Sequence, residues 1–180
     1  TFLKNICENI KKYKHKNIFF LVLADRKTPT EAKSYCKKIS KKFKIKIIYL
    51  DIEKQDHYFK KKYKNLYSLI PYNDNMRRLL GLIYIKECNP KRVIFIDDDN
   101  FVSSQVDFLK GHSIVSTKVS GKSIYINSKW PNIYKYLETE NNLPIFPRGF
   151  PWSKRDIKNF KFKFKKVKNK LVLANCGFIL

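Results

Sequence analysis

The sequence has 180 residues, of which 43% are hydrophobic and 15% aromatic, and it carries a formal net charge of +24. This length and apolar content predict a single globular domain over residues 1–180, which we expect to be incomplete at both ends. No apolar stretch approaches the roughly 20 residues of a membrane-spanning helix, and the start lacks the zones of a signal peptide. We therefore expect a cytoplasmic protein without a transmembrane segment in this chain.

The excess positive charge indicates an anionic partner, such as a phosphate compound, a nucleic acid or a membrane surface. Most of the 39 basic residues are lysines spread over every segment, which is typical of solvated faces. The sequence also has no RRM, KH or zinc-knuckle signature, so we expect no specific nucleic-acid binding. The four cysteines match no zinc motif and are predicted to be reduced, buried thiols. We interpret His15, His57 and His112 as ordinary surface histidines.

Helix and strand patterns alternate along the first part of the chain. An amphipathic helix from Phe2 to Tyr13 is followed by a continuous apolar strand, Ile18–Ala24. Thr28-Pro29-Thr30-Glu31 has the form of a capping box, which predicts that a second helix begins there. Its predicted buried face is formed by Ala32, Tyr35, Cys36, Ile39 and Phe43. A second apolar strand, Ile45–Leu50, follows that helix. This order favours an α/β domain with a mostly parallel, doubly wound sheet flanked by helices.

The next segments are less regular. Gln55–Ser68 is polar, basic and aromatic, and predicts a weakly specified helix or loop. Pro71–Asp74 is a turn that would cap a helix from about Asn75 to Glu87. The apolar residues at helical spacing predict its buried stripe, which is Met76, Leu79, Leu80, Ile83 and Tyr84. Arg77 and Arg78 lie in the first turn of that helix, where positive charge opposes the helix dipole. They therefore indicate either an anion bound nearby or side chains that simply point into solvent.

Three adjacent carboxylates follow the apolar run Val93–Ile96, which we expect to be a strand buried on both faces. Clustered negative charges are hard to keep ionised unless a cation shares them, and oxygen-rich clusters suit Mg²⁺ or Mn²⁺ carrying a diphosphate. We assign Asp97 and Asp99 as candidate metal ligands and Asp98 as a candidate contact to the nucleotide. The alternative is a solvated acidic turn that closes the strand.

Two further aspartates end the earlier predicted strands. Asp25 follows Ile18–Ala24 and Asp51 follows Ile45–Leu50, at the sheet edge where open α/β sheets bind ligands. Their carboxylates could accept hydrogen bonds from the base and ribose of a nucleotide. The alternative is that they only terminate their strands.

After the carboxylate triplet the sequence changes character. Ser113–Val119 and Lys122–Asn127, joined across Ser-Gly, predict a small β-hairpin. Pro131–Leu137 predicts a short helix, Lys158–Lys170 a basic connector, and Leu171–Ala174 a last strand.

Leu143–Arg155 contains three prolines, which predict a stiff loop that can be neither a central strand nor a helix interior. We expect this loop to form a wall of the ligand pocket, with Arg148 and Arg155 as candidate catalytic cations. Phe150 and Trp152 are equally compatible with stacking on a sugar ring and with packing against the core.

Several motifs, taken in order, resemble a known family over roughly Ile18–Phe178. They are Val-Leu-Ala-Asp25-Arg-Lys-Thr-Pro29, Ile-Pro71-Tyr-Asn73, the helix Met76–Lys86, Phe-Ile-Asp97-Asp98-Asp99-Asn100 and Pro147-Arg148-Gly149-Phe150-Pro151. Together they resemble the GT-A nucleotide-sugar glycosyltransferase domain of the STELLO-like proteins and, more distantly, the reversibly glycosylated polypeptides, which include UDP-arabinopyranose mutases.

The resemblance implies a Rossmann-like sheet, a donor such as a UDP-sugar, and Mn²⁺ or Mg²⁺ at the Asp motif. It leaves open whether the reaction is a transfer or a mutase reaction, and whether the acceptor is a glycan, a lipid or a protein. A diphosphate leaving group needs its charge neutralised, and a metal held by Asp97 and Asp99 with cations such as Arg148, Lys154 and Arg155 would meet that need. The competing hypotheses are a basic nucleic-acid-binding module and a non-catalytic scaffold that binds sugar nucleotides.

Overall fold

The computed structural model describes residues 1–126, 132, 145–146, 150–155 and 162–172. The chain forms two compact units, one comprising Thr1–Ser116 among these residues and the other lying within Thr117–Val172. Each unit is described by itself. Together their helices and strands make a mixed α/β protein.

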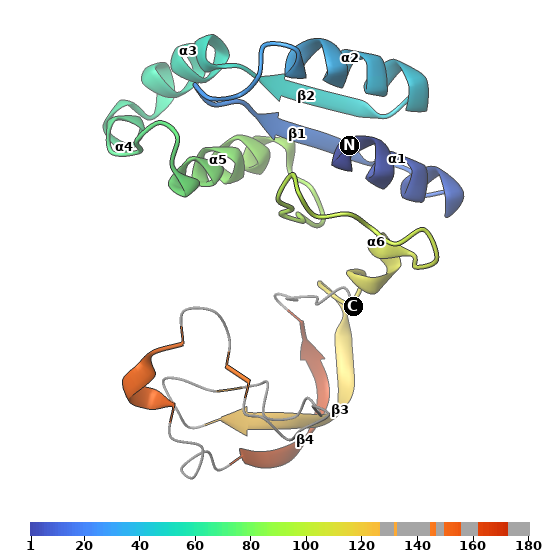
Figure 1. Ribbon diagram of the computed structural model, residues 1–180. Helices are drawn as coiled ribbons and strands as arrows, with labels where there is room; N and C mark the ends of the chain where they lie inside the picture. Colours follow the sequence, from blue (N-terminus) through green and yellow to red (C-terminus); the bar gives the residue numbers. More distant parts are fainter. Residues whose placement is uncertain (127–131, 133–144, 147–149, 156–161, 173–180) are drawn as a thin grey trace. The chain divides into compact units, whose positions relative to one another are not determined.

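The first unit contains most of the elements (Figure 1). They are, in order, α1 Phe2–Lys12, β1 Phe19–Leu23, α2 Ala32–Phe43, β2 Lys46–Leu50, α3 Ile52–Lys62, α4 Lys64–Ser68, the 3-10 turn η1 Asn75–Arg77, α5 Arg78–Cys88 and α6 Phe108–Gly111. β1 and β2 are parallel, with a register that runs from Phe19 opposite Lys46 to Leu23 opposite Leu50. Both predicted strands and their parallel pairing are thereby confirmed.

The predicted third strand is not formed. Val93–Ile96 is not part of any strand, and the side chains alternate between two environments. Val93 and Phe95 are 40% and 51% exposed, whereas Ile94 and Ile96 pack against the core. The prediction of burial on both faces was wrong because, in the part of the chain that the structure describes, only one face of this apolar run is covered.

Two apolar clusters hold the first unit together. One joins α1 to α2 through buried residues that include Ile6, Ile10, Ile39 and Phe43. The other joins α3, α4 and α5, and it is built on Phe59, Tyr67, Ile70 and Leu80.

α5 packs closely against β1 at Gly81. A Cβ atom added at Gly81 would lie 3.0 Å from Cδ1 of Leu23, which is closer than side chains normally approach. Leu80 is buried as predicted, but Met76 and Leu79, which we assigned to the same buried stripe, are 48% and 42% exposed. The predicted stripe is therefore exposed at its start, in η1 and the first turn of α5, and covered from Leu80 onward, where Ile83 and Tyr84 pack against the second cluster.

The start of α2 also differs from its prediction. The helix begins at Ala32, and its N-cap residue, Glu31, makes no side-chain capping bond. The Thr28 hydroxyl instead accepts a hydrogen bond of 2.7 Å from the backbone N–H of Asp25. The capping box was wrong because Thr28 closes the loop after β1. The predicted buried face is confirmed by Cys36, Ile39 and Phe43.

The second unit contains the antiparallel strands β3 Lys118–Ile126 and β4 Phe162–Leu171, and the 3-10 turn η3 Trp152–Lys154. The predicted hairpin across Ser120 and Gly121 was wrong, since β3 continues through both residues. The register shifts between Val119 and Gly121, so the Ser-Gly pair marks an irregularity within a strand rather than a turn. Most of the predicted basic connector is strand β4, which ends at Leu171. The predicted helix Pro131–Leu137 lies almost wholly outside the described residues.

The cysteine prediction is confirmed in part. Cys7 and Cys36 are buried free thiols, whereas Cys88 is exposed and Cys176 lies outside the described residues. Burial raises the pKa of the Cys7 thiol to about 11. None of the described helices has the length and apolar character that crossing a bilayer requires.

Candidate functional site

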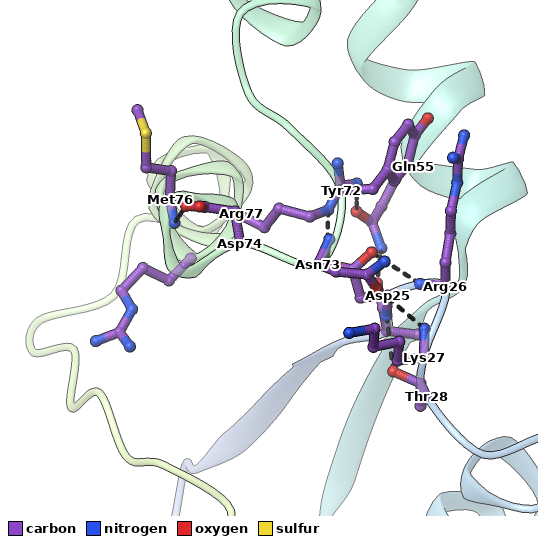
Figure 2. Close-up of polar contacts among 12 residues, drawn as sticks. Asp25, Arg26, Lys27, Thr28, Gln55, Tyr72, Asn73, Asp74, Met76 and Arg77 are labelled. Carbon is purple, nitrogen blue, oxygen red and sulfur yellow. Dashed lines mark hydrogen bonds and ion pairs between the residues drawn. The ribbon is translucent and has the colours of Figure 1, made fainter.

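The loop after β1 is organised around the carboxylate of Asp25 (Figure 2). Oδ1 accepts a hydrogen bond of 2.7 Å from the backbone N–H of Arg26, and Oδ2 accepts one of 2.7 Å from the backbone N–H of Asn73. Oδ2 also lies 3.5 Å from Nε of Arg77. Both oxygens are therefore engaged within the protein, and the Asp25 side chain is 22% exposed.

Hydrogen bonds of Asn73 connect this loop to the segment before α5. Its side-chain oxygen accepts a hydrogen bond of 3.1 Å from the backbone N–H of Lys27, while its own backbone N–H donates to Asp25. Its φ of 55° lies in the left-handed region, which asparagine tolerates better than most residues because its short polar side chain bonds locally. Asn73 thus fixes the conformation of residues 25–27 from both sides.

Arg77 lies behind Asp25 and is only 4% exposed. Its guanidinium donates to Oε1 of Gln55 and, at 3.3 Å, to the Tyr67 hydroxyl. It also lies 4.3 Å from the ring centroid of Tyr72. The charge of Arg77 is therefore balanced by the chain's own Asp25, and the alternative of a side chain pointing into solvent was wrong for Arg77, whereas Arg78 is largely exposed.

Gln55 connects Arg77 to both strands. Its side-chain N–H groups donate to the carbonyl of Ala24, directly after β1, at 2.7 Å and to that of Leu50, the last residue of β2, at 2.8 Å. Gln55 is fully buried. The network of Asp25, Gln55 and Arg77 therefore joins the two strands at their carboxyl ends.

A second carboxylate, Asp56, supports the aromatic rings of this network. Its Oδ1 accepts hydrogen bonds from the hydroxyls of Tyr67 at 2.6 Å and Tyr72 at 3.0 Å, and its Oδ2 accepts one from Lys60 at 2.7 Å. Burial tends to raise the pKa of Asp56, but the hydrogen bonds from Lys60 and the two tyrosines outweigh it and lower that pKa. Burial and the bond to Asp56 raise the pKa of the Tyr67 hydroxyl.

Two cations of the same loop remain exposed. The guanidinium of Arg26 stacks on the ring of Tyr72, 3.7 Å from its centroid, and Lys27 extends from the next residue. Neither cation was predicted as a site residue from the sequence, and neither were Gln55, Tyr72 and Asn73. The available signal was the position of Arg26 and Lys27, directly after the strand-ending aspartate.

The carboxylate triplet is exposed, and Asp97 pairs with a neighbouring arginine. Asp97 Oδ1 lies 3.5 Å from a terminal nitrogen of Arg78, with side chains that are 65% and 49% exposed. Asp99 accepts a hydrogen bond of 3.0 Å from the side chain of Asn100. Adjacent residues of one helical turn, Arg77 and Arg78, thereby contact Asp25 and Asp97. Of the predicted site residues, the structure thus joins these two separate pairs.

Asp51 has a structural partner at each oxygen. Oδ1 accepts a hydrogen bond of 3.0 Å from the backbone N–H of Lys54 and caps α3, and Oδ2 accepts one of 2.8 Å from Nζ of Lys33. The bond from Lys33 is the main cause that lowers the pKa of Asp51. The alternative of a strand-terminating residue is the one that these contacts favour.

The segment after the triplet is anchored to α1. Asn9, which is 4% exposed, donates to the carbonyls of Ser103 at 3.1 Å and Val106 at 2.8 Å. Asn5 exchanges two hydrogen bonds with the backbone of Val102. His15, which we predicted to be an ordinary surface residue, lies 2.6 Å from Asp107. Two asparagines of α1, together with His15 just beyond its end, therefore hold residues 102–107, a few residues after the triplet.

Of the two predicted catalytic cations, the structure describes one. Arg148 lies outside the described residues. Arg155 belongs to the second unit, where its guanidinium donates to the Phe150 carbonyl at 3.2 Å and lies 3.6 Å from the ring of Trp152. Phe150 is buried, as the packing interpretation predicted, whereas Trp152 is 82% exposed.

The oxygen ligands at the triplet suit a hard divalent cation. The described residues contain no group of three His, Cys, Asp or Glu side chains that could hold a metal ion by itself. Mg²⁺ is commonly bound by one or two carboxylates together with substrate phosphates and water. A cation at Asp97 and Asp99 would therefore need further ligands from substrate phosphates and water.

No family model matches the chain, and no curated protein matches it.

Proposed function

We propose that this chain is a GT-A-type nucleotide-sugar glycosyltransferase domain, resembling those of the STELLO-like proteins, that acts in the cytoplasm. The donor would bind at the carboxyl ends of β1 and β2. The observation that carries the proposal is the pairing of consecutive arginines, Arg77 and Arg78, with Asp25 and Asp97. It supports a shared site because ligands of open α/β sheets bind at this edge.

In this proposal the residues have separate tasks. Asp25, Asn73 and Arg77 hold the loop after β1, and this loop presents Arg26 and Lys27 to solvent. Asp97 and Asp99 would hold Mg²⁺ or Mn²⁺, which would neutralise the charge on a diphosphate leaving group. Arg78, already beside Asp97, can turn toward a phosphate, because both side chains are largely exposed. Charge-assisted bonds from an arginine to phosphate are among the strong hydrogen bonds in proteins.

The test is UDP binding measured by calorimetry with and without Mn²⁺. The double variant Asp97→Asn with Asp99→Asn is expected to weaken Mn²⁺-dependent binding by tenfold or more, because both charged metal ligands are lost. A tenfold loss corresponds to about 1.4 kcal/mol of binding free energy. Without metal its stability should hold or rise, because crowded like charges are removed. Glu8→Gln with Glu87→Gln is the matched control, since it removes two exposed carboxylates that pair with Lys4 and Lys62.

Unchanged Mn²⁺-dependent affinity in the Asp97/Asp99 double variant would overturn the metal assignment. If UDP-sugar binds but is neither hydrolysed nor transferred, the non-catalytic scaffold becomes the better description. Conversion between two forms of the sugar nucleotide without an acceptor would identify a mutase.

A further inference from the structure

The two-stranded ribbon formed by β3 and β4 carries like charges on opposing strands. Lys122 stands directly opposite Lys166 in the antiparallel register. Side chains of such cross-strand pairs lie close together on one face, and like charges there repel each other. No acidic residue occurs in either strand to relieve this repulsion.

The whole second unit is strongly basic. Thr117–Val172 contains fourteen lysine and arginine residues against three acidic residues. The exposed ribbon lysines without a hydrogen bond or ion pair among the described residues are Lys118, Lys122, Lys166, Lys168 and Lys170. A solvated face normally mixes both signs of charge, whereas this ribbon presents positive charge alone.

Large apolar side chains lie among these lysines. Phe164 lies on the same strand as Lys166, two residues before it and therefore on the same face, and it is 62% exposed. Leu171 stands opposite Lys118 beyond the register shift and is 54% exposed. The ribbon therefore offers cations and apolar side chains together.

We propose that the β3–β4 ribbon is a peripheral binding surface for an anionic lipid membrane, independently of the donor site. Lysines can reach lipid phosphates and carboxylates while Phe164 and Leu171 enter the boundary of the acyl chains. A nucleic acid would use the lysines equally well. Bases could stack on Phe164, but an exposed aliphatic side chain such as Leu171 suits the acyl boundary of a membrane better than it suits a base.

The test is co-sedimentation of the full chain with vesicles of phosphatidylcholine, with and without phosphatidylserine, at an ionic strength of about 0.15 M. The triple variant Lys122→Gln, Lys166→Gln and Lys168→Gln should bind phosphatidylserine vesicles roughly 100-fold more weakly, at about fivefold per lysine. The matched control changes three exposed lysines of α2, Lys37, Lys38 and Lys41, to glutamine, and it should retain binding within a few fold.

A second variant tests the apolar contribution. Phe164→Ser with Leu171→Ser keeps every charge, and we expect it to remove the part of the binding that survives high salt. The lysine variant should melt no lower than the wild type, because it removes the repulsion between Lys122 and Lys166. Equal losses in the α2 control would show that only net charge matters and would overturn the proposal. Tighter binding to single-stranded RNA or duplex DNA than to the vesicles would assign the ribbon to nucleic acid instead.

Discussion

Replacing Arg77 by methionine isolates the contribution of the buried network beneath the candidate site. Methionine keeps most of the aliphatic volume but removes the charge and all donors. Asp25 would then lose its buried cation, while Oε1 of Gln55 would lose its hydrogen-bond donor. Removing one partner of a fully buried ion pair costs about 3–5 kcal/mol, because the other charge remains uncompensated.

Asp25 reduces that cost, since it keeps the backbone donors of Arg26 and Asn73 and its side chain is 22% exposed. We therefore take the low end of that range for the Asp25–Arg77 pair. This value already includes part of the cost of the hydrogen bond that Gln55 loses. The expected loss in the free energy of unfolding is about 3 kcal/mol. Urea denaturation followed by circular dichroism measures it as a lower midpoint with an unchanged slope.

Arg78→Met is the matched control one residue along the chain. Arg78 is 49% exposed and its contact to Asp97 is a surface pair, so the expected loss of stability is below about 0.5 kcal/mol. The same variant should weaken UDP binding if Arg78 serves the diphosphate. A loss of stability below about 1 kcal/mol for Arg77→Met, or equal losses of stability for both variants, would refute the reasoning that Arg77 contributes more to stability than Arg78 because it is buried.

Two further predictions test the carboxyl ends of the strands. Asp51→Ala should lower the free energy of unfolding by about 1 kcal/mol through loss of the α3 cap, whereas Asp51→Asn should retain most of it, as chemical denaturation can show. The folded state lowers the pKa of Asp51 from 3.8, so the charge of Asp51 adds its full contribution to the free energy of unfolding above that value. This contribution is lost as the pH falls through the lowered pKa, and Asp51→Asn should lack this acid dependence. Gly81→Val should cost about 1–3 kcal/mol in the same assay, because its Cβ would press on Leu23 at 3.0 Å. Stability equal to that of the wild type would contradict the packing of α5 on β1.

The features predicted well are those that short-range periodicity determines. β1 and β2 are continuous apolar runs, and α2 has apolar residues at helical spacing, so each could be located from a few consecutive residues. Periodicity does not state how many faces of a run will be covered. Val93–Ile96 has the composition of a buried strand, yet Val93 and Phe95 are exposed. Burial depends on which segments pack against the run, and that information lies far away in the sequence.

The sequence indicated several residues of the candidate site, but it did not indicate which residues they contact. Strand-end aspartates and the paired arginines could be named from their positions alone. Asn73 gave no such signal, because its importance comes from a left-handed backbone and from contacts to Asp25 and Lys27. Asn9 is similar, since its three partners lie in residues 103–108. Such hydrogen bonds between distant segments leave no pattern in a single sequence.

One step along a helical turn rotates the side chain by about 100°, and this geometry separates the roles of Arg77 and Arg78. Arg77 turns inward and neutralises Asp25, whose carboxylate is then saturated by donors of the chain itself. Arg78 turns outward beside Asp97, where both charges stay hydrated and can be exchanged for those of a ligand. Asp25 is therefore suited to shaping the loop that carries Arg26 and Lys27. The exposed carboxylates of Asp97 and Asp99 are the ones that an incoming cation and diphosphate could reach without breaking the fold.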